Sequence, residues 1–308
     1  MEYIQAGQMI RELRKRKGLS QEQLCEGLCE PPTMSKIEKG RQYPSKKLLD
    51  ALLVRLQEHI ELQVPLSPSD FARAQIEHEI ISRVSCHDDN ILELLEQYKT
   101  CSATMNNHEQ QFYLFALAMY HTGIEGKWEL AKEELEKAIH LTIPKYEEGQ
   151  DISTIMLTSI EFAILNNIAI CNWFLNHKDK AVNLMKQLYD VLEECDSDSE
   201  EYAKRLPMIC YNLSMWLGIR KDYGKSLSVA EKGIECCLKY GKYGSLTDLL
   251  YNKGFTLLCL GRNEEGKLAL KKTFMLIYAC NNQSAYTAFK EDLLKSFGEN
   301  VWTAVQVI

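Results

Sequence analysis

Two sets of polar side chains in this sequence could bind a partner, and they lie far apart along the chain. The first is a cluster of cations within residues 1–62, where 11 Lys and Arg stand against 9 Asp and Glu. The remainder holds 25 basic and 34 acidic residues. Because nucleic acid phosphates attract cations and repel carboxylates, only the first part is suited to approach DNA or RNA. The clustered cations are Arg11, Arg14, Lys15, Arg16, Lys17, Lys36, Lys39, Arg41, Lys46 and Lys47.

The second set consists of asparagines that recur at one position of three similar segments, residues 163–192, 208–238 and 248–277. A small residue follows each asparagine after two residues, and another follows after fourteen. Small side chains at such positions let paired helices approach closely. The three asparagines are Asn167, Asn212 and Asn252. The small residues are Ala169, Ser214, Gly254, Ala181, Ser226 and Gly266.

An asparagine amide carries a donor and an acceptor, so it can pair with a peptide bond much as a neighbouring strand does. Asparagine is also a poor residue for a helix interior. One such residue could simply satisfy a local backbone carbonyl, but a column of three on one side of a groove favours a ligand. The predicted ligand-binding set includes neighbouring residues of the column. Its members are Asn166, Asn167, Tyr211, Asn212, Tyr251 and Asn252.

The sequence offers no pattern for catalysis or for a metal. It contains no nucleophile–base set, no glycine-rich phosphate loop and no H-E-x-x-H sequence. Its 11 cysteines are odd in number and scattered, without a C-x-x-C pair, which is typical of reduced thiols that act as small buried hydrophobes. We therefore expect no enzyme activity, no cofactor and no metal site.

The ends and apolar runs of the chain predict a cytoplasmic protein. The first residues, Met1–Gln5, lack a basic segment followed by an apolar stretch, so no signal peptide is expected. No apolar run reaches the ~20 residues of a membrane span. We expect no membrane partner.

Four short helices are predicted to position the N-terminal cations. The first covers about residues 4–17 and ends at Gly18. The second runs over residues 21–28, with Ser20 and Gln23 spaced as a capping box. The third spans about 32–39, where Pro31 and Pro32 suit a first helical turn. The fourth opens at Pro44-Ser45 and carries a leucine stripe. Four such helices, with a tight turn between the second and third, form a helix-turn-helix.

The spacing of residue types over about residues 6–57 resembles the phage-repressor type of helix-turn-helix, the XRE family. The stretches that carry the resemblance are residues 10–14, 18–24, 34–40 and 44–45. The resemblance implies double-stranded operator DNA as a partner, with the third helix in the major groove. By this resemblance, Gln21 donates to a phosphate, Thr33 and Lys36 face base edges, Lys39 and Arg41 contact phosphates, and Arg14 pairs with Glu38.

The sequence departs from the XRE-family pattern at the turn and the start of the third helix. It reads Glu30-Pro31-Pro32 there, where many relatives have Gln, Ser or Arg. Proline offers no donor to a base edge. Base reading then depends on Thr33, Lys36 and apolar contact with thymine methyl groups, which leaves the operator sequence open.

Behind a predicted hinge at residues 63–69, which contains Pro65 and Pro68, the chain from residue 70 to residue 308 has helical periodicity with brief breaks. Its repeated small residues resemble tetratricopeptide repeats with a period of 40–45 residues. The predicted fold is therefore all-α: a helix-turn-helix domain at residues 1–62 and a right-handed superhelical repeat array with a concave groove. Residues from about 283 onward, including Trp302, are expected to cap the array or pair with another subunit.

A helix-turn-helix followed by about five such repeats resembles the RRNPP group of peptide-pheromone-responsive regulators, and within it the PlcR type. This resemblance implies quorum sensing: a short signalling peptide lies in the groove, and asparagines of the first helix of each repeat grip its backbone. It also implies a transcription regulator. We expect a homodimer, because one helix-turn-helix makes too few contacts for tight specific binding.

Three alternatives stay open at this point. The array could dock a protein and make the chain an adaptor, or the regulator could be a ligand-independent repressor with structural asparagines. Some relatives without the DNA-binding domain act on phospho-relay proteins. The sequence leaves open the peptide, the target genes and the sign of regulation.

Overall fold

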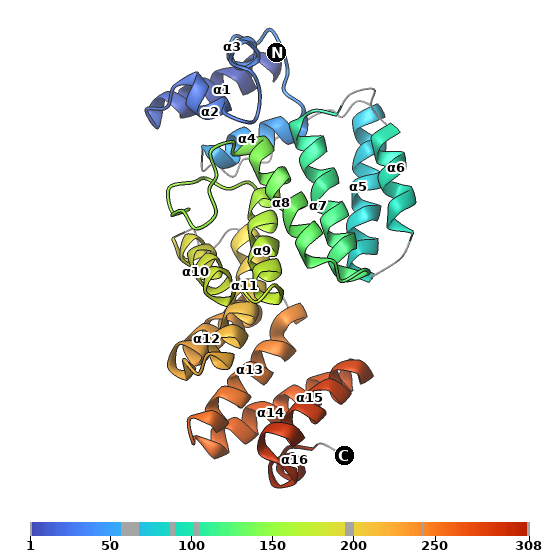
Figure 1. Cartoon of the computed structure of the whole chain (residues 1–308). Coiled ribbons are helices and arrows are strands. Elements are labelled where there is room, and N and C mark those ends of the chain that lie inside the picture. Colours follow the sequence, from blue (N-terminus) through green and yellow to red (C-terminus); the bar gives the residue numbers. More distant parts are fainter. Residues whose placement is uncertain are drawn as a thin grey trace. The chain divides into compact units, whose positions relative to one another are not determined.

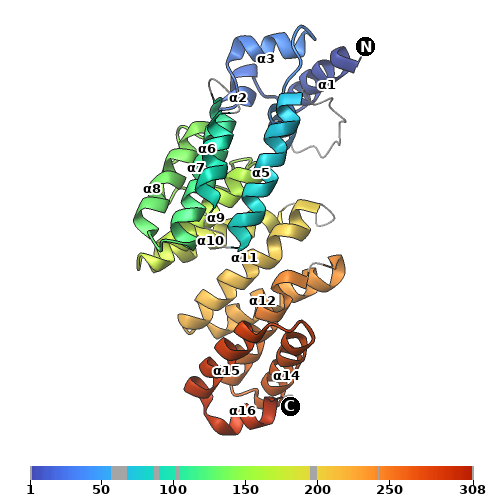
Figure 2. The ribbon, with the colours of Figure 1, turned by 90° about the vertical axis from the view of Figure 1, so that its right-hand side faces the viewer.

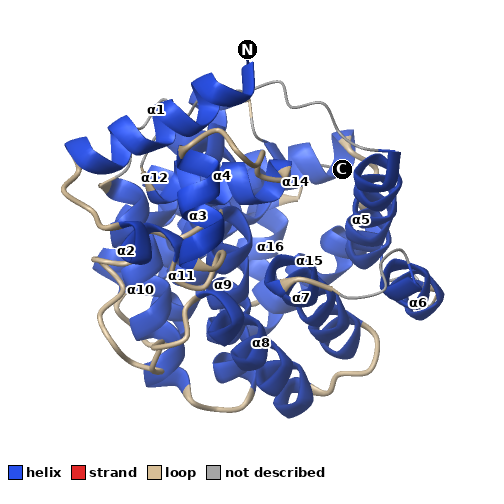
Figure 3. Ribbon diagram, turned by 90° about the horizontal axis from the view of Figure 1, so that it is seen from above, coloured by secondary structure: helices blue, strands red, loops and turns tan. Residues whose placement is uncertain are grey.

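The structure is a computed structural model, and it describes residues 2–56, 68–86, 90–100, 105–194, 200–241 and 243–306. Every regular element in these ranges is a helix (Figure 3). The all-α prediction is confirmed. The chain forms two compact units, Met1–Ala181 and Val182–Ile308. Within the described residues, none of the helices combines the length and the apolar character that crossing a membrane requires.

The N-terminal domain consists of α1 (Glu2–Arg16), α2 (Gln21–Cys25), α3 (Pro31–Glu38) and α4 (Lys46–Arg55). Ser20 caps α2 in the predicted capping box, and Ser45 caps α4 through the Leu48 amide. Buried Ile10, Leu24 and Ile37 bring three of the helices into one apolar core with the leucines of α4. The predicted helix-turn-helix is therefore present.

Helix α2 is shorter than predicted, because it ends at Cys25 and not at Leu28. Gly27 leaves the helical conformation with φ of +74°. A Cβ atom at this position would overlap the carbonyl oxygen of Thr142, so the turn depends on glycine in two ways. Sequence periodicity carries no information about such a contact with a distant residue.

The first unit continues with α5 (Pro68–Cys86), α6 (Ile91–Thr100), α7 (Asn107–Gly123), α8 (Trp128–Thr142) and α9 (Ser159–Phe174). Helices α7 and α8 form a tightly packed antiparallel pair (Figure 1). Residues 63–67 of the predicted hinge lie outside the described residues. Pro68 and Ser69 belong to α5, so the last part of that prediction is wrong, and proline suits the first turn of a helix.

Only brief breaks between helices were predicted after residue 70, but the structure has one long connection. Residues 143–158, between α8 and α9, contain only turns and irregular backbone. The loop is anchored by Glu148, whose carboxylate accepts hydrogen bonds from Asn172 at 2.8 Å and from Lys180 at 2.6 Å. Lys132 lies 2.9 Å from the same carboxylate. Burial opposes ionisation of Glu148, but these donors outweigh it and lower its pKa to about 2. Structureless connections of this length are uncommon and often functional.

The second unit holds the end of α10 (Lys178–Glu193), then α11 (Glu200–Ile219), α12 (Tyr223–Tyr240), α13 (Leu246–Cys259), α14 (Asn263–Ala279), α15 (Gln283–Phe297) and α16 (Glu299–Val305). A short 3₁₀ turn, Tyr243–Ser245, precedes α13. The helices follow one another as antiparallel pairs (Figure 2). The turns between the paired helices contain residues with positive φ, namely Asn176, Lys221 and Gly261. At the end, Trp302 packs edge-on against Phe274 and caps α14.

Candidate functional site

The exposed edge of α3 is the first candidate surface. Glu30 precedes the helix, and Pro31 and Pro32 occupy its first two positions, where a missing N–H leaves no intrahelical bond unmade. Met34 and Ile37 point into the core. The opposite side carries Thr33, which is half-buried, and Lys36, which is exposed.

Two further predicted DNA-contacting residues follow directly after α3. Lys39 is the C-cap residue of α3, and both Lys39 and Arg41 are exposed. The amide of Arg41 donates to the Lys36 carbonyl at 2.8 Å, which turns the chain back beside the helix. The structure thus brings Thr33, Lys36, Lys39 and Arg41 together within one short helix and its cap.

A buried ion pair joins α1 to α3. Arg14 donates through Nε and Nη2 to the two carboxylate oxygens of Glu38, the second at 2.9 Å, and through Nη1 to the Leu19 carbonyl at 2.7 Å. Both side chains are at least nine-tenths buried. Burial alone would raise the pKa of Glu38, but the hydrogen bonds from Arg14 and Gln21 outweigh burial, and the pKa is lowered. This pair ties α3 to α1.

Gln21 differs from the simple expectation of a phosphate donor. Its Nε2 already donates to Glu38 Oε2 at 2.6 Å, because the carboxylate lies directly beneath the start of α2. A primary amide has two N–H groups, so one remains for an external acceptor. The structure therefore places Gln21 in the network that supports α3.

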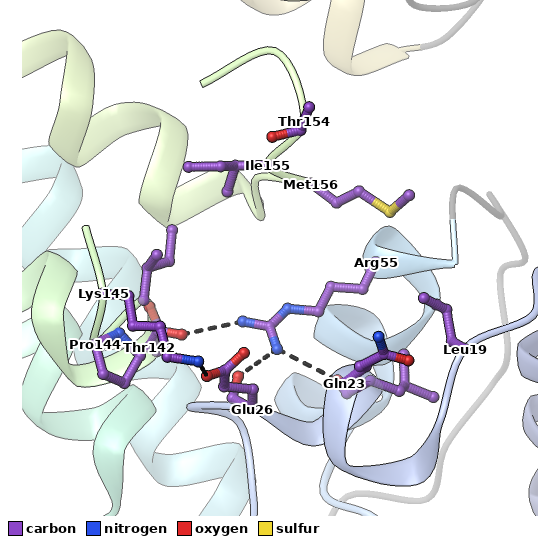
Figure 4. Close-up of a pocket in the computed structure, with 12 residues that line it drawn as sticks. Leu19, Gln23, Glu26, Arg55, Thr142, Pro144, Lys145, Thr154, Ile155 and Met156 are labelled. Carbon is purple, nitrogen blue, oxygen red and sulfur yellow. Dashed lines mark hydrogen bonds and ion pairs between the residues drawn. The ribbon is translucent and has the colours of Figure 1, made fainter. Parts of the chain in front are cut away.

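Arg55 of α4 lies at the centre of the contact between the helix-turn-helix domain and the repeats of the first unit (Figure 4). Its Nη1 donates to the carbonyls of Leu24, at 3.2 Å, and of Glu26. Its Nη2 donates to the Thr142 carbonyl at the end of α8, at 3.1 Å. One guanidinium thus holds α2, α4 and α8 together.

Further polar contacts flank Arg55. Asn107 Nδ2 bridges the carbonyls of Gly27 and Leu141, at 3.4 and 3.0 Å, and Lys145 pairs with Glu26 at 2.6 Å. A cavity of about 290 Å³ lies beside this junction. Its walls come from the helix-turn-helix domain and from the 143–158 loop, which contributes Ile155 and Met156 above Arg55 (Figure 4). Sequence analysis did not anticipate this junction.

The two asparagines of the first unit lie on α9 in different surroundings. Asn166 is 2% exposed, and its Oδ1 has no hydrogen-bond partner among the described residues. Asn167 is half-buried and donates to the Ala163 carbonyl one turn earlier, at 2.8 Å. The local carbonyl bond considered from sequence is thus present at Asn167.

In the second unit, α11 and α13 pack side by side and bring their asparagines into one region. The Asn252 amide donates to Ser214 Oγ at 2.9 Å and to the Tyr211 carbonyl at 3.2 Å. Asn212 is nine-tenths buried, and its side chain makes no hydrogen bond with any residue that the structure describes. A largely buried polar side chain is usually hydrogen-bonded, so Asn212, without such a bond among the described residues, is the member of the column best suited to an external ligand.

Tyr251 does not share this region. It is buried in the C-terminal core, where its ring stacks on Phe289 at 4.0 Å and its hydroxyl donates to Asp292. The side chain of the residue before Asn252 points toward α15, because consecutive helix positions differ by about 100°. Tyr211 is half-buried and lies close enough to Asp248 for that carboxylate to raise the pKa of Tyr211, after the larger effect of burial.

Asp248 is a candidate that sequence analysis missed. It lies four residues before Asn252, on the same face of α13. Burial raises its pKa, and it forms no ion pair with any described residue. The signal available in the sequence was the spacing of four between a carboxylate and the asparagine column. Among the described residues, no group of three His, Cys, Asp or Glu side chains could hold a metal ion.

Comparison with known families agrees with this architecture. A family model described as a helix-turn-helix domain matches residues 5–61, and the C-terminal domain of the RNPP family matches residues 77–292. The chain belongs to the RNPP family. A search of the curated proteins found no match.

Solved structures of other RNPP-type regulators share the fold. PlcR from Bacillus thuringiensis, in complex with the peptide PapR7 and DNA, has 23% sequence identity and a TM-score of 0.57, over 93% of this chain and 99% of that one. The apo form of PlcR has 20% identity and a TM-score of 0.53, over 95% and 99%. ComR from S. thermophilus, in complex with DNA and its signalling peptide ComS, has 16% identity and a TM-score of 0.52, over 94% and 99%.

Proposed function

We propose that this RNPP-family chain is a sequence-specific DNA-binding transcription regulator that is controlled by a short signalling peptide. The observation that carries the proposal is the presence, on one chain, of two complementary features. One is the exposed basic edge of α3 within a helix-turn-helix, and the other is the largely buried residue Asn212, whose side chain has no described hydrogen-bond partner. The similar PlcR and ComR structures contain both DNA and a peptide, which supports the same pair of ligands here.

On the DNA side, α3 enters the major groove with Thr33 and Lys36 at base edges. Lys39 and Arg41 contact phosphates and position the domain without reading sequence. Gln21 offers its second amide hydrogen to a phosphate while it keeps its bond to Glu38. The Arg14–Glu38 pair holds α3 in place and takes no part in contacting DNA.

On the peptide side, Asn212 donates to and accepts from the backbone of an extended peptide, with Tyr211 beside it. Asn252 contributes its amide oxygen while Ser214 and the Tyr211 carbonyl hold its nitrogen. Asn166 and Asn167, on α9 of the first unit, stay predicted peptide-binding residues. Asp248, desolvated and without a described cation, favours a positively charged group on the peptide.

The proposed division of the chain is a DNA-binding domain at residues 1–62, a connection that starts at residue 63 and ends where α5 begins at Pro68, and a peptide sensor from Pro68 to residue 308. Matches to the helix-turn-helix model at 5–61 and to the RNPP C-terminal model at 77–292 support this division. The regulator acts as a homodimer in the cytoplasm, where two copies of α3 read paired half-sites.

Two selections on the full-length chain test the proposal. Selection from a random duplex library should enrich sites with two half-sites about 10 base pairs apart or a multiple of that. Calorimetry with positional-scanning libraries of heptapeptides should show binding, strongest for members with a cationic residue. Failure to enrich any duplex would contradict the DNA-binding part. Binding of DNA without any peptide would favour a ligand-independent repressor, and recovery of only a protein partner would favour an adaptor.

A further inference from the structure

The cavity beside Arg55 has no role in the proposed contacts with DNA or with the peptide. Its volume of about 290 Å³ is near the lower end of the range for small-molecule sites. The residues that line it all belong to the first unit. One wall comes from the helix-turn-helix domain, and the other from the end of α8 and the 143–158 loop (Figure 4). The cavity is therefore large enough for a small molecule that touches both domains at once.

The apolar part of the lining is aliphatic. Leu19 and Leu24 contribute from the helix-turn-helix domain, and Ile143, Ile155 and Met156 from the opposite wall. All of these except Leu24 are only half-buried, so an apolar ligand would cover surface that now meets water. Because the lining contains no aromatic ring, stacking contributes nothing, and a ligand with an aliphatic body is favoured.

The polar groups at the cavity that remain without a partner are donors. The guanidinium of Arg55 already occupies three backbone carbonyls at this junction through its Nη atoms. The side-chain oxygen of Gln23 accepts from the Ser20 amide at 2.7 Å. Neither Arg55 Nε nor the side-chain nitrogen of Gln23 has an acceptor among the described residues. A ligand with acceptor atoms is therefore the chemical match.

The charges indicate that the acceptor is an anion. Arg55 and Lys145 line the cavity against one carboxylate, that of Glu26. The Lys145–Glu26 pair is exposed, and such pairs are weak, so Lys145 can be shared with a ligand at little cost. Burial lowers the pKa of Arg55, and Glu161, which does not line the cavity, lies 3.9 Å from Arg55 Nη2. The lining thus carries one cation more than it has anions.

We propose that this cavity binds a small aliphatic carboxylic acid in its ionised form. The carboxylate accepts from Arg55 Nε and pairs with Lys145, and the chain lies between Leu19 and Met156. A ligand that contacts both walls stabilises their contact, by the linkage of binding to conformation. The site is distinct from the asparagines of the proposed peptide sensor.

Calorimetric titration of the full-length chain with sodium octanoate tests the proposal. It uses neither DNA nor peptide, so a negative result leaves the proposed function untouched. We expect saturable binding at one site. Octanamide, which keeps the chain but loses the charge, should bind about tenfold more weakly or worse, since charge-assisted hydrogen bonds are the stronger ones. Hexanoate should also bind about tenfold more weakly, because it buries two fewer methylene groups. Bound octanoate should slow hydrogen exchange in α2 and at residues 142–145.

Two substitutions locate the site. Met156→Trp should fill the cavity and weaken octanoate binding by about tenfold or more, as overpacking opposes entry of a ligand. Lys145→Gln, an exposed change that leaves the core intact, should weaken octanoate binding by about three- to tenfold and leave octanamide binding unchanged. If Met156→Trp does not fold, Lys145→Gln alone decides.

The matched control is Lys127→Gln. Lys127 also pairs with an exposed glutamate, Glu125, at 2.9 Å, but it does not line the cavity. This variant should bind octanoate within about twofold of the native chain, since a distant exposed charge contributes little. Absence of saturable binding, equal affinity for octanoate and octanamide, or equal losses in Lys145→Gln and Lys127→Gln would overturn the proposal.

Discussion

The exposed edge of α3 and the asparagine region of α11 and α13 differ in which of their polar side chains are hydrogen-bonded within the protein. Around α3, polar groups that hold the helix are buried and paired, as in Arg14 and Glu38, whereas Lys36 and Arg41 remain exposed. In the second unit, the Asn252 amide donates to its own protein, and buried Asn212 has no described partner. At α3, the residues that hold the helix differ from those predicted to contact DNA, whereas in the proposed sensor one asparagine column contains both engaged and unengaged side chains.

This division has an energetic consequence. We expect the preformed α3 surface to bind DNA without rearranging its own hydrogen bonds. Each phosphate contact then adds to the affinity for DNA. In the proposed sensor, we expect a peptide to gain most at Asn212, whose side chain has no described hydrogen-bond partner. At Asn252 the amide nitrogen already donates to the Tyr211 carbonyl and to Ser214 Oγ. A peptide there can either compete for that nitrogen or donate to the amide oxygen.

The largest expected effect comes from breaking the support of α3. Arg14→Ala strands the Glu38 carboxylate in the core, which costs about 3–5 kcal/mol for a buried pair. Differential scanning calorimetry of the full-length chain should show the N-terminal domain melting early while the repeats keep their transition. Arg11→Ala, an exposed cation on the same helix, is the control and should melt like the native chain. Equal melting of both variants would contradict a supporting role for the pair.

The next effect concerns the junction between the helix-turn-helix domain and α8. Gly27→Ala adds a methyl group against the Thr142 carbonyl at a position with positive φ. Backbone strain of this kind costs about 1–3 kcal/mol. Hydrogen exchange of α2 and of the end of α8 should accelerate together.

Gly18→Ala provides the matched control for this junction. Gly18 has nearly the same φ, +70°, but nothing lies within 4 Å of an added Cβ. It should therefore show strain in the turn after α1 without faster exchange at α8. If the two variants changed α8 equally, the contact of Gly27 with Thr142 would not hold the junction.

A smaller effect separates the asparagines from one another. Asn212→Ala should weaken peptide binding ten- to a hundredfold, because losing one bond to a buried peptide group costs about 1–3 kcal/mol. Asn167→Ala should weaken it less, since that amide already bonds the Ala163 carbonyl. Calorimetry with a peptide selected from the heptapeptide library measures both. Equal losses would remove the distinction between free and engaged amides.

The smallest effect distinguishes base reading from phosphate contact at α3. Lys36→Ala should relax base preference at one or two positions. Arg41→Ala should weaken binding evenly across sequences and reduce the slope of affinity against salt by roughly one unit. Fluorescence anisotropy over a salt series, with the selected duplex and single-base variants, separates the two. A change in base preference in both variants would show that the roles of Lys36 and Arg41 are assigned wrongly.

Local signals predicted most of the fold. The Ser20 capping box and the prolines at the start of α3 depend on neighbours in sequence. Side-chain and backbone partners distant in sequence escaped prediction. Examples are the bond from Gln21 to Glu38 and the contact of Gly27 with Thr142.

In the candidate site, too, features set by neighbours in sequence were predicted and features set by distant residues were not. The column of asparagines was visible as a repeat, but which amides are engaged depends on how α11 packs on α13. The direction of Tyr251 toward Phe289 required the position of α15. The 143–158 loop also escaped prediction, because its anchor Glu148 is held by residues from three different helices.

One measurement tests the central claim most directly: the affinity of the full-length chain for its selected duplex, with and without a selected heptapeptide, in the native protein and in Asn212→Ala. We predict that the peptide changes the affinity of the native protein for DNA at least tenfold. In Asn212→Ala, DNA binding without peptide should equal that of the native protein, and the same peptide concentration should leave it unchanged. An equal shift in both proteins, or no shift in the native protein, would contradict peptide control through this site.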